Sequence, residues 1–329
     1  MKKVIGIGNA LVDLIYFLEN DLLLEAFSLP KGSMQLVDAE KAGQVEQSTG
    51  SLSRFMASGG SAANTIHGLA RMGVTTAFIG TVGNDNFGRF FEDDMKACNI
   101  TPLLSKGSLG TGRAISLVSQ GGERTFATYL GAAIELSDNL LNETMFSKYD
   151  HLHLEGYLVP NQVLVENALK LAGKNQMTAS LDLASYNVVE ANLDFLKRII
   201  SDYKPLVFAN EEEARSFSGY DNPGKALDYL SRLTDAAVVK TGSKGSLVFH
   251  KGKKFEVRAI SANCIDTTGA GDLYAAGYIY GFINDMDPAI SGRIGSLLAG
   301  KVIEEAGAKI CQASWEFIKE SMAGIQNNP

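Results

Sequence analysis

The alternation of short apolar runs with helix-length segments is the feature that most restricts how this chain can fold. Runs that read as buried strands are VIGIG, TTAFIGTVG, HLHLEG, TASLDL, PLVFAN and AAVVKTG. A segment such as SAANTIHGLARMG reads as a helix, with Ser61 as its candidate N-cap and Gly73 as its C-terminal stop. Strand–helix alternation predicts an α/β fold with a mostly parallel sheet covered on both faces. Such sheets bind ligands beyond the carboxyl ends of their strands.

Two regions, about 12–37 and about 100–130, break this alternation. The second contains two strand-like runs, GRAISLVSQ and RTFATYL, separated by Gly121 and Gly122, which is typical of a hairpin. Two strand-rich insertions in an α/β chain predict a small second sheet, and covering an active site is a natural task for it. We therefore expect one domain over residues 1–329, with these two regions as its lid.

Composition excludes several classes of partner. The net charge is −7 and the chain has no basic block, so nucleic acid is not expected as its main partner. No run reaches the roughly 18 uncharged apolar residues of a membrane-spanning helix, and Asn9 and Asp13 interrupt the apolar N-terminus, which therefore does not read as a signal peptide. The three scattered cysteines favour a reducing compartment. We expect a cytoplasmic protein that binds no membrane.

The stretch DTTGAGD, residues 266–272, is the strongest candidate for chemistry. Gly269 and Gly271 leave backbone amides unobstructed where a helix starts, and the positive end of the helix dipole lies behind them, which makes an anion site. Asp272 in the first turn could accept a proton from a substrate hydroxyl, as phosphoryl transfer requires. The structural alternative is a tight turn with an Asp that stabilises the helix end.

Other polar residues have a structural alternative of the same kind. Gly59 and Gly60 before a helix would let a ligand approach the backbone, with Asn64 facing it, or they form only a loop. Asp13 lies in an apolar stretch, where a carboxylate is costly unless it is paired or faces a cleft, or else it belongs to a turn. Asn210 and Glu213 have capping-box spacing, and the same pair could hold the waters of a bound Mg²⁺.

The turn between two strand-like runs at VVKTGSKGSLVF contains Gly242 and Gly245. A hairpin is one interpretation, and a loop beside the phosphates of a nucleotide is the other. The chain has no G-x-x-x-x-G-K-[ST] motif and neither H-R-D nor D-F-G. Walker-type ATPases and protein kinases are therefore excluded.

In their order along the chain, these motifs resemble the PfkB, or ribokinase-like, carbohydrate kinase family. The GG-x-x-x-N of residues 59–64 resembles its N-terminal signature and DTTGAGD its C-terminal one, and the resemblance covers essentially the whole chain. It implies a ribokinase-like three-layer sandwich with a small β-sheet lid. It also implies phosphoryl transfer from ATP, with Mg²⁺, to a small-molecule sugar or nucleoside, by a monomer or a homodimer.

The resemblance also implies roles for single residues. Those at the reacting centre are the catalytic base Asp272, the anion hole Gly269, Ala270 and Gly271, and a lid arginine, Arg124, that approaches the phosphates on closure. Those that bind the acceptor are Asn9, Asp13, Gly59, Gly60, Asn64 and Glu155. Those that bind ATP are Asn210, Thr241, Gly242 and Gly245. Glu213 would hold Mg²⁺ through water, and Asp266 and Thr268 match positions that bind a monovalent cation such as K⁺ in some relatives.

The phosphoryl acceptor is less tightly specified. GNALVDL and GGSAAN resemble the adenosine-kinase branch, which implies an adenosine-like nucleoside phosphorylated at its 5′-hydroxyl. Ribose or another pentose or hexose is the alternative acceptor, and a non-catalytic sensor of sugars or nucleosides is the alternative function. A nucleobase needs an apolar slot, for which the candidates are Tyr16, Phe126, Tyr129 and Tyr157. Packing in the core is the other role open to these aromatic residues.

Overall fold

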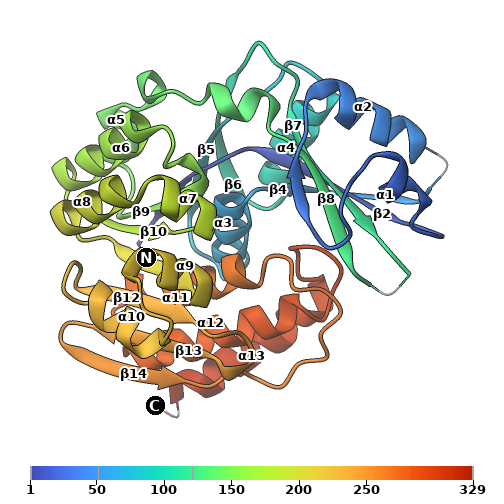
Figure 1. Cartoon of the computed structure of the whole chain (residues 1–329). Coiled ribbons are helices and arrows are strands. Elements are labelled where there is room, and N and C mark those ends of the chain that lie inside the picture. The colour runs from blue at the N-terminus through green and yellow to red at the C-terminus, as the bar shows by residue number, and fades with distance from the viewer. Residues whose placement is uncertain (1, 51, 121, 328–329) are drawn as a thin grey trace.

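The computed structural model describes residues 2–50, 52–120 and 122–327, and two sheets carry its architecture (Figure 1). The strands of the large sheet are, in spatial order, β14 (Lys253–Val257), β13 (Ser246–His250), β12 (Ala236–Lys240), β11 (Leu206–Asn210), β10 (Thr178–Asp182), β9 (His151–Glu155), β1 (Val4–Ile7), β5 (Thr76–Val82) and β6 (Ile100–Lys106). Every pairing from β12 to β6 is parallel, whereas β13 and β14 form an antiparallel edge. The predicted mostly parallel sheet is confirmed.

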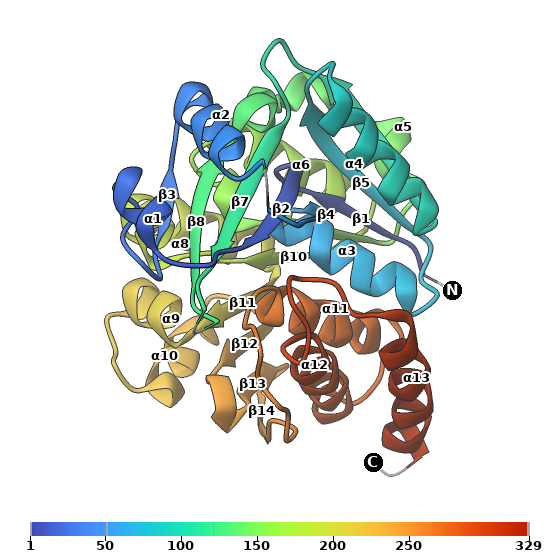
Figure 2. The same cartoon turned by 90° about the vertical axis from the view of Figure 1, so that its right-hand side faces the viewer.

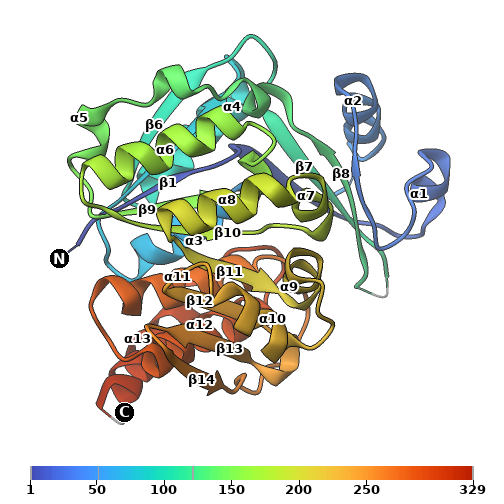
Figure 3. The ribbon, with the colours of Figure 1, turned by 60° about the vertical axis from the view of Figure 1, so that its left-hand side comes forward.

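Helices cover both faces of the large sheet (Figures 2 and 3). On one side lie α3 (Ser61–Arg71), α4 (Asn86–Ala97), α11 (Ala270–Ile283), α12 (Pro288–Val302) and α13 (Gln312–Asn327). On the other lie α5 (Glu143–Phe146), α6 (Gln162–Lys174), α7 (Tyr186–Ala191), α8 (Leu193–Tyr203), α9 (Glu211–Ser218) and α10 (Pro223–Leu230). Short 3-10 turns are η1 (Gly131–Glu135), η2 (Asp138–Leu140), η3 (Gly156–Leu158) and η4 (Gly242–Lys244).

Side chains of one strand alternate between the two hydrophobic layers. In β1, Val4 belongs to the layer that contains Ile66 of α3, while Ile5 and Ile7 belong to the layer that contains Leu164 of α6. This alternation follows from the two-residue period of a strand. It produces the three-layer sandwich that the sequence predicts.

The small sheet stands beside the large one and has the order β3 (Met34–Leu36), β8 (Arg124–Tyr129), β7 (Gly112–Val118), β2 (Leu11–Phe17) and β4 (Arg54–Gly59). The helices α1 (Leu22–Ala26) and α2 (Ala39–Ser48) accompany it (Figure 3). Strands β7 and β8 are antiparallel, as the hairpin prediction requires, although Gly121 lies outside the described residues. A small second sheet is therefore confirmed.

The bounds expected for the lid need two corrections. Strand β6 lies within the 100–130 region but pairs with β5 at the edge of the large sheet. Strand β4 belongs to the small sheet although it follows the 12–37 region. The burial of β6 explains the first error, because only Ile100 in it is fully buried and the strand lacks the apolar run of the central strands.

The backbone passes between the two sheets over very short distances. Residues Gly8 to Ala10 alone separate β1 from β2, and Gly60 alone separates β4 from α3. Within the described ranges, no helix combines the length and apolar character needed to cross a bilayer. The three cysteines are free thiols.

Candidate active site

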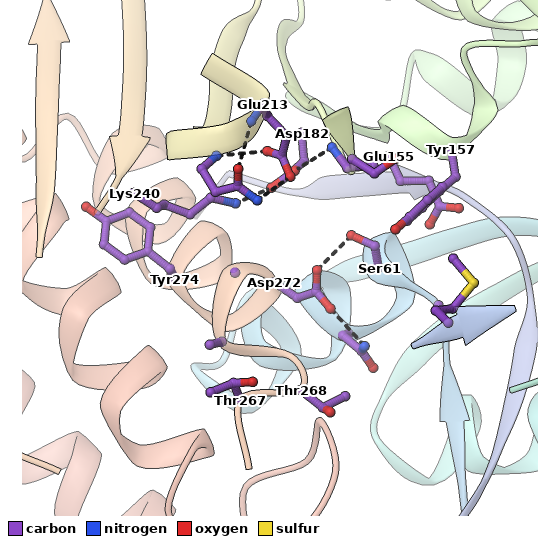
Figure 4. Close-up of a pocket in the computed structure, with 18 of the residues that line it drawn as sticks. Ser61, Glu155, Tyr157, Asp182, Glu213, Lys240, Thr267, Thr268, Asp272 and Tyr274 are labelled. Carbon is purple, nitrogen blue, oxygen red and sulfur yellow. Dashed lines mark hydrogen bonds and ion pairs between the residues drawn. The ribbon is translucent and has the colours of Figure 1, made fainter. Parts of the chain in front are cut away.

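A cleft of about 1220 Å³ opens between the small sheet, the strand ends of the large sheet and helix α11. Polar residues at the carboxyl ends of four neighbouring parallel strands line it: Glu155, Asp182, Asn210 and Lys240. This is the edge at which parallel sheets bind ligands. Figure 4 shows Glu155, Asp182 and Lys240 on the same side of the cleft, facing Asp272.

The start of α11 has the geometry that the DTTGAGD motif predicts, shifted by one residue. Gly269 caps the helix with a φ of +77°, and a Cβ there would lie 2.6 Å from Ala308, so only glycine fits without strain. The Ala270 amide bonds to the Thr267 carbonyl. Among the described residues, the Gly271 and Asp272 amides have no recorded partner, and both residues line the cleft. The free donors are therefore Gly271 and Asp272, whereas Gly269 is absent from the cleft wall.

Asp272 is held by two side chains of α3. Ser61 Oγ donates to its Oδ1 at 2.7 Å and Asn64 Nδ2 donates to its Oδ2 at 2.9 Å (Figure 4). Burial raises the pKa of Asp272, while the hydrogen bonds from Asn64 and Ser61 lower it. The expectation that Ser61 caps α3 is wrong, because Gly60 is the N-cap and makes no side-chain bond. The Ser61 hydroxyl is thereby free to bind the carboxylate.

The residues expected to bind the acceptor lie at this end of the cleft, with one exception. Asn9, Asp13, Gly60, Asn64 and Glu155 line the cleft. Gly59 does not, but a Cβ on it would lie 2.2 Å from Asp13 Oδ1, so its lack of a side chain makes room for that carboxylate. Burial raises the pKa of Asp13 to about 6, against the opposing effect of the Lys309 ammonium.

Glu155 makes three hydrogen bonds to its own chain. Its Oε1 accepts from the amide and side chain of Asn9, at 2.9 Å and 2.6 Å, and its Oε2 accepts from the Ala62 amide at 2.9 Å. Burial raises its pKa to about 7. Glu155 thus ties the end of β1 to the first turn of α3, in addition to facing the cleft.

Asn210 and Glu213 form the capping box that their spacing predicts, and they face the cleft as well. The Asn210 side chain accepts from the Glu213 amide at 2.8 Å, and Glu213 accepts from the Asn210 amide at 2.8 Å. Burial raises the pKa of Glu213 to about 7, although the Lys240 ammonium opposes this. Asn210 and Glu213 can therefore cap helix α9 and face a bound ligand at the same time.

The described residues contain no group of three or more His, Cys, Asp or Glu side chains that could enclose a metal ion. Glu213 and Asp182 both contribute carboxylates to the cleft wall. Mg²⁺ commonly keeps several waters and binds through one or two carboxylates plus substrate phosphates. The donor set therefore fits hydrated Mg²⁺ and does not fit a closed protein cage.

The glycine turn after β12 is the predicted hairpin, since β12 and β13 are antiparallel. The Thr241 amide donates to the Gly245 carbonyl at 2.8 Å and closes the turn. Gly242 and Gly245 face the cleft, while Thr241 is buried behind them. The turn can therefore also serve as a ligand loop.

Arg124, Asp266 and Thr268 form one hydrogen-bonded cluster, in which the side chains of Arg124 and Asp266 are buried and Thr268 lines the cleft. Arg124 Nη2 lies 2.9 Å from Asp266 Oδ2, and the Gly307 amide donates to the same oxygen at 2.6 Å. The amide and hydroxyl of Thr268 donate to Asp266 Oδ1 at 3.1 Å and 2.8 Å. Both carboxylate oxygens of Asp266 therefore have protein donors. Arg124, the expected lid arginine, points at Asp266 and does not line the cleft.

Apolar side chains line the cleft on both sides of this polar centre. Those from the small sheet and its neighbours are Met34, Leu36, Phe126, Leu130, Ile134 and Tyr157. Those near α12 are Ala259, Ile260, Ala262, Ala299, Gly300 and Ile303. Of the aromatic candidates, Phe126 and Tyr157 line the cleft, Tyr16 is buried in the core, and Tyr129 packs under the Arg113 guanidinium.

Sequence reasoning missed four polar residues of this site: Ser61, Asp182, Lys240 and Lys309. Asp182 and Lys240 end predicted parallel strands, and the rule that ligands bind there could have identified them. Lys309 comes from the loop before α13, and its Nζ donates to Asn64 Oδ1 at 3.3 Å. No local pattern marks Lys309, because it reaches the site only through tertiary packing.

Comparisons with known proteins agree with this geometry. The sequence pattern described as "pfkB family carbohydrate kinase" matches residues 35–315. The chain is 28% identical to a nucleoside kinase of Methanocaldococcus jannaschii, over 98% of this chain and 97% of that protein. It is 26% identical to a 5-dehydro-2-deoxygluconokinase of Bacillus licheniformis, over 80% of this chain and 86% of that protein. A crystal structure of adenosine kinase from Sinorhizobium meliloti superposes with a TM-score of 0.88 at 29% identity and covers 97% of this chain and 99% of that one. The chain therefore belongs to the pfkB family of carbohydrate kinases and is a phosphotransferase that acts on an alcohol group.

Proposed function

We propose that this kinase transfers the γ-phosphoryl group of ATP to the 5′-hydroxyl of an adenosine-like nucleoside. The observation that carries the choice of a nucleoside is the apolar wall beside the acceptor end of the cleft. Met34, Leu36 and Phe126 of the small sheet and Tyr157 of the large domain line this wall. A free ribose has no apolar part that would bury them, whereas a nucleobase does.

The polar residues next to this wall suit the ribose. In the proposed complex Asp13 and Asn64 bind the ribose hydroxyls, and Asn9 lies beside them. The 5′-hydroxyl then points toward Asp272, which takes its proton while the oxygen attacks phosphorus. The amides of Gly271 and Asp272 stabilise negative charge on the transferred group. Closure of the small sheet would exclude water and protect ATP from hydrolysis.

Glu213 and Asp182 would hold hydrated Mg²⁺ at the phosphates, and the turn with Gly242 and Gly245 would contact the nucleotide. When bound, Mg²⁺ neutralises part of the phosphate charge. The small apolar residues near α12 offer room for the adenine of ATP. We place the protein in the cytoplasm, in keeping with its free cysteines.

A coupled assay of ADP release tests the proposed function. We expect a higher kcat/KM with adenosine than with ribose or fructose, and no turnover with 5′-deoxyadenosine, which lacks the acceptor hydroxyl. Replacing Asp272 by Asn should lower kcat roughly 10²–10⁴-fold, because the base is lost. A preference for ribose or fructose would overturn the nucleoside assignment. Near-normal turnover by D272N would overturn the role of Asp272.

A further inference from the structure

Lys240 is a charged residue of the cleft wall to which the proposed mechanism gives no task. It ends strand β12, lines the cleft, and has only 15% of its side chain exposed. Removing an ammonium from water to this degree is costly unless nearby groups compensate. Such a group is retained here at the point where a phosphoryl group would be transferred.

Asp182 fixes the position of the Lys240 ammonium beside Gly271. Nζ of Lys240 donates to Asp182 Oδ2 at 2.8 Å (Figure 4). Asp182 Oδ1 in turn accepts from the Ala184 amide at 3.0 Å. Nζ also lies 3.1 Å from the place where a Cβ on Gly271 would be. The ammonium is therefore adjacent to the free amides at the start of α11.

The hydrogen bonds of Lys240 leave part of its ammonium open to a ligand. Only one of its three protons has a partner among the described residues, so two remain available to a ligand. A lysine held only for structure would have no need of this open side.

Resting on the proposed function, we propose that Lys240 is a catalytic residue that binds the γ-phosphoryl group during its transfer. Asp182 holds the ammonium in place before ATP binds. As the group leaves ADP, negative charge on its oxygens meets the ammonium and the amides of Gly271 and Asp272 together. Fixed donors in a site that excludes water stabilise such charge strongly.

The geometry also gives a reason for glycine at position 271. A side chain there would lie in the space between the ammonium and the amides, since its first carbon would already be 3.1 Å from Nζ. Lys240 and Gly271 thus form one cradle, although they come from different layers of the fold.

The first experiment compares Lys240→Met with Lys253→Met, a matched change at an exposed lysine of β14 outside the cleft wall. We expect K240M to lower kcat roughly 10²–10³-fold, the cost of losing one preorganised donor at developing charge. The KM for the acceptor should stay unchanged, K253M should match the native enzyme, and K240R should recover part of kcat. Equal turnover of K240M and K253M would overturn the proposal.

The second experiment needs no acceptor and therefore separates this proposal from the proposed function. Calorimetric titration compares ADP with a non-hydrolysable ATP analogue, each with Mg²⁺. The native protein should bind the analogue more tightly than ADP, and K240M should lose that difference. If no acceptor is phosphorylated but the difference is lost, the proposed function fails while the role of Lys240 stands. An unchanged difference in K240M would overturn the role of Lys240.

If Lys240 had only a structural role, the kcat values of the variants would be ordered differently. The double variant D182N/K240M removes both charges of this ion pair, so neither is left unpaired. Thermal unfolding checks that the variant folds. If Lys240 served only to neutralise Asp182, this variant would regain the kcat of D182N. We expect it to remain as slow as K240M.

Discussion

Asp272 illustrates how single residues set the chemistry of this site. In the proposed mechanism its carboxylate must lose its proton before it can take one from a substrate hydroxyl. Burial opposes that loss and raises its pKa, whereas Asn64 and Ser61 favour the ionised form by donating hydrogen bonds to it. The pH at which the enzyme becomes active therefore depends on two side chains of a different helix.

Removing the Ser61 hydroxyl tests this balance. In Ser61→Ala the pKa of Asp272 should rise, because a hydrogen bond that lowers it is lost. A larger fraction of Asp272 is then protonated at a given pH, so the acid limb of the kcat/KM profile moves to higher pH. At alkaline pH the variant should approach the native rate.

The matched control is Ser53→Ala, at an exposed serine that precedes β4. Its profile should coincide with the native one. An acid limb that stays in place or moves to lower pH in S61A would show that the Ser61 bond does not tune Asp272.

Among the elements, strand β8 makes a contact with the loop before α11 that its sequence does not predict. Arg124 at its start pairs with Asp266, and the two side chains are only 8% and 4% exposed. Asp266 also anchors Gly307 and Thr268, directly before the helix start at Gly269. A buried ion pair therefore joins strand β8 of the small sheet to the loop that leads into α11.

Replacing Arg124 by Met should lower the free energy of unfolding by about 3 kcal/mol, since it leaves a buried carboxylate without its counter-charge. Denaturant unfolding measures this loss. The double variant R124M/D266N should be more stable than R124M, because it removes the unpaired charge. Arg54→Met, at an exposed arginine of β4, should be close to neutral. Equal stability of R124M and R54M would contradict a structural role for the pair.

At the scale of the whole molecule, the cleft has a polar centre between two apolar ends. Leu36 lies at the small-sheet end and is 65% exposed, which suggests that a bound acceptor covers it. Leu22 of α1 is 67% exposed but does not line the cleft. The two leucines therefore have similar exposure, but of the two it is Leu36 that lines the cleft.

Replacing Leu36 by Asp should raise the KM for adenosine at least tenfold, because burial of a leucine contributes roughly 1.5–3 kcal/mol. The KM for ATP should not change, since the proposed ATP site is at the other end. Leu22→Asp should leave both constants as they are. A rise in the KM for ATP, or none for adenosine, would contradict this division of the cleft.

Sequence reasoning succeeded where the signal is local. The strand and helix periods of the large sheet, the capping box of Asn210 and Glu213, and the helix start at Gly269 all depend on neighbouring residues. It failed where contacts between residues far apart in the sequence determine the structure. The edge strand β6 lacks a buried run, Ser61 bonds across to α11, and Arg124 pairs with a residue 142 positions away. Lys309 and Lys240 reach the centre only because the fold brings them there.

The short crossings at Gly8 to Ala10 and at Gly60 have an evolutionary consequence. They separate strands β2 and β4 of the small sheet from β1 and α3, while Asn9 and Gly60 in the crossings themselves line the cleft. Under the proposed mechanism, mutations that remodel the small sheet can therefore change which alcohol is accepted without disturbing the groups that move the proton and the phosphoryl group. A single ancestral enzyme with this layout could give rise to descendants with different acceptors through changes on one side of these crossings alone.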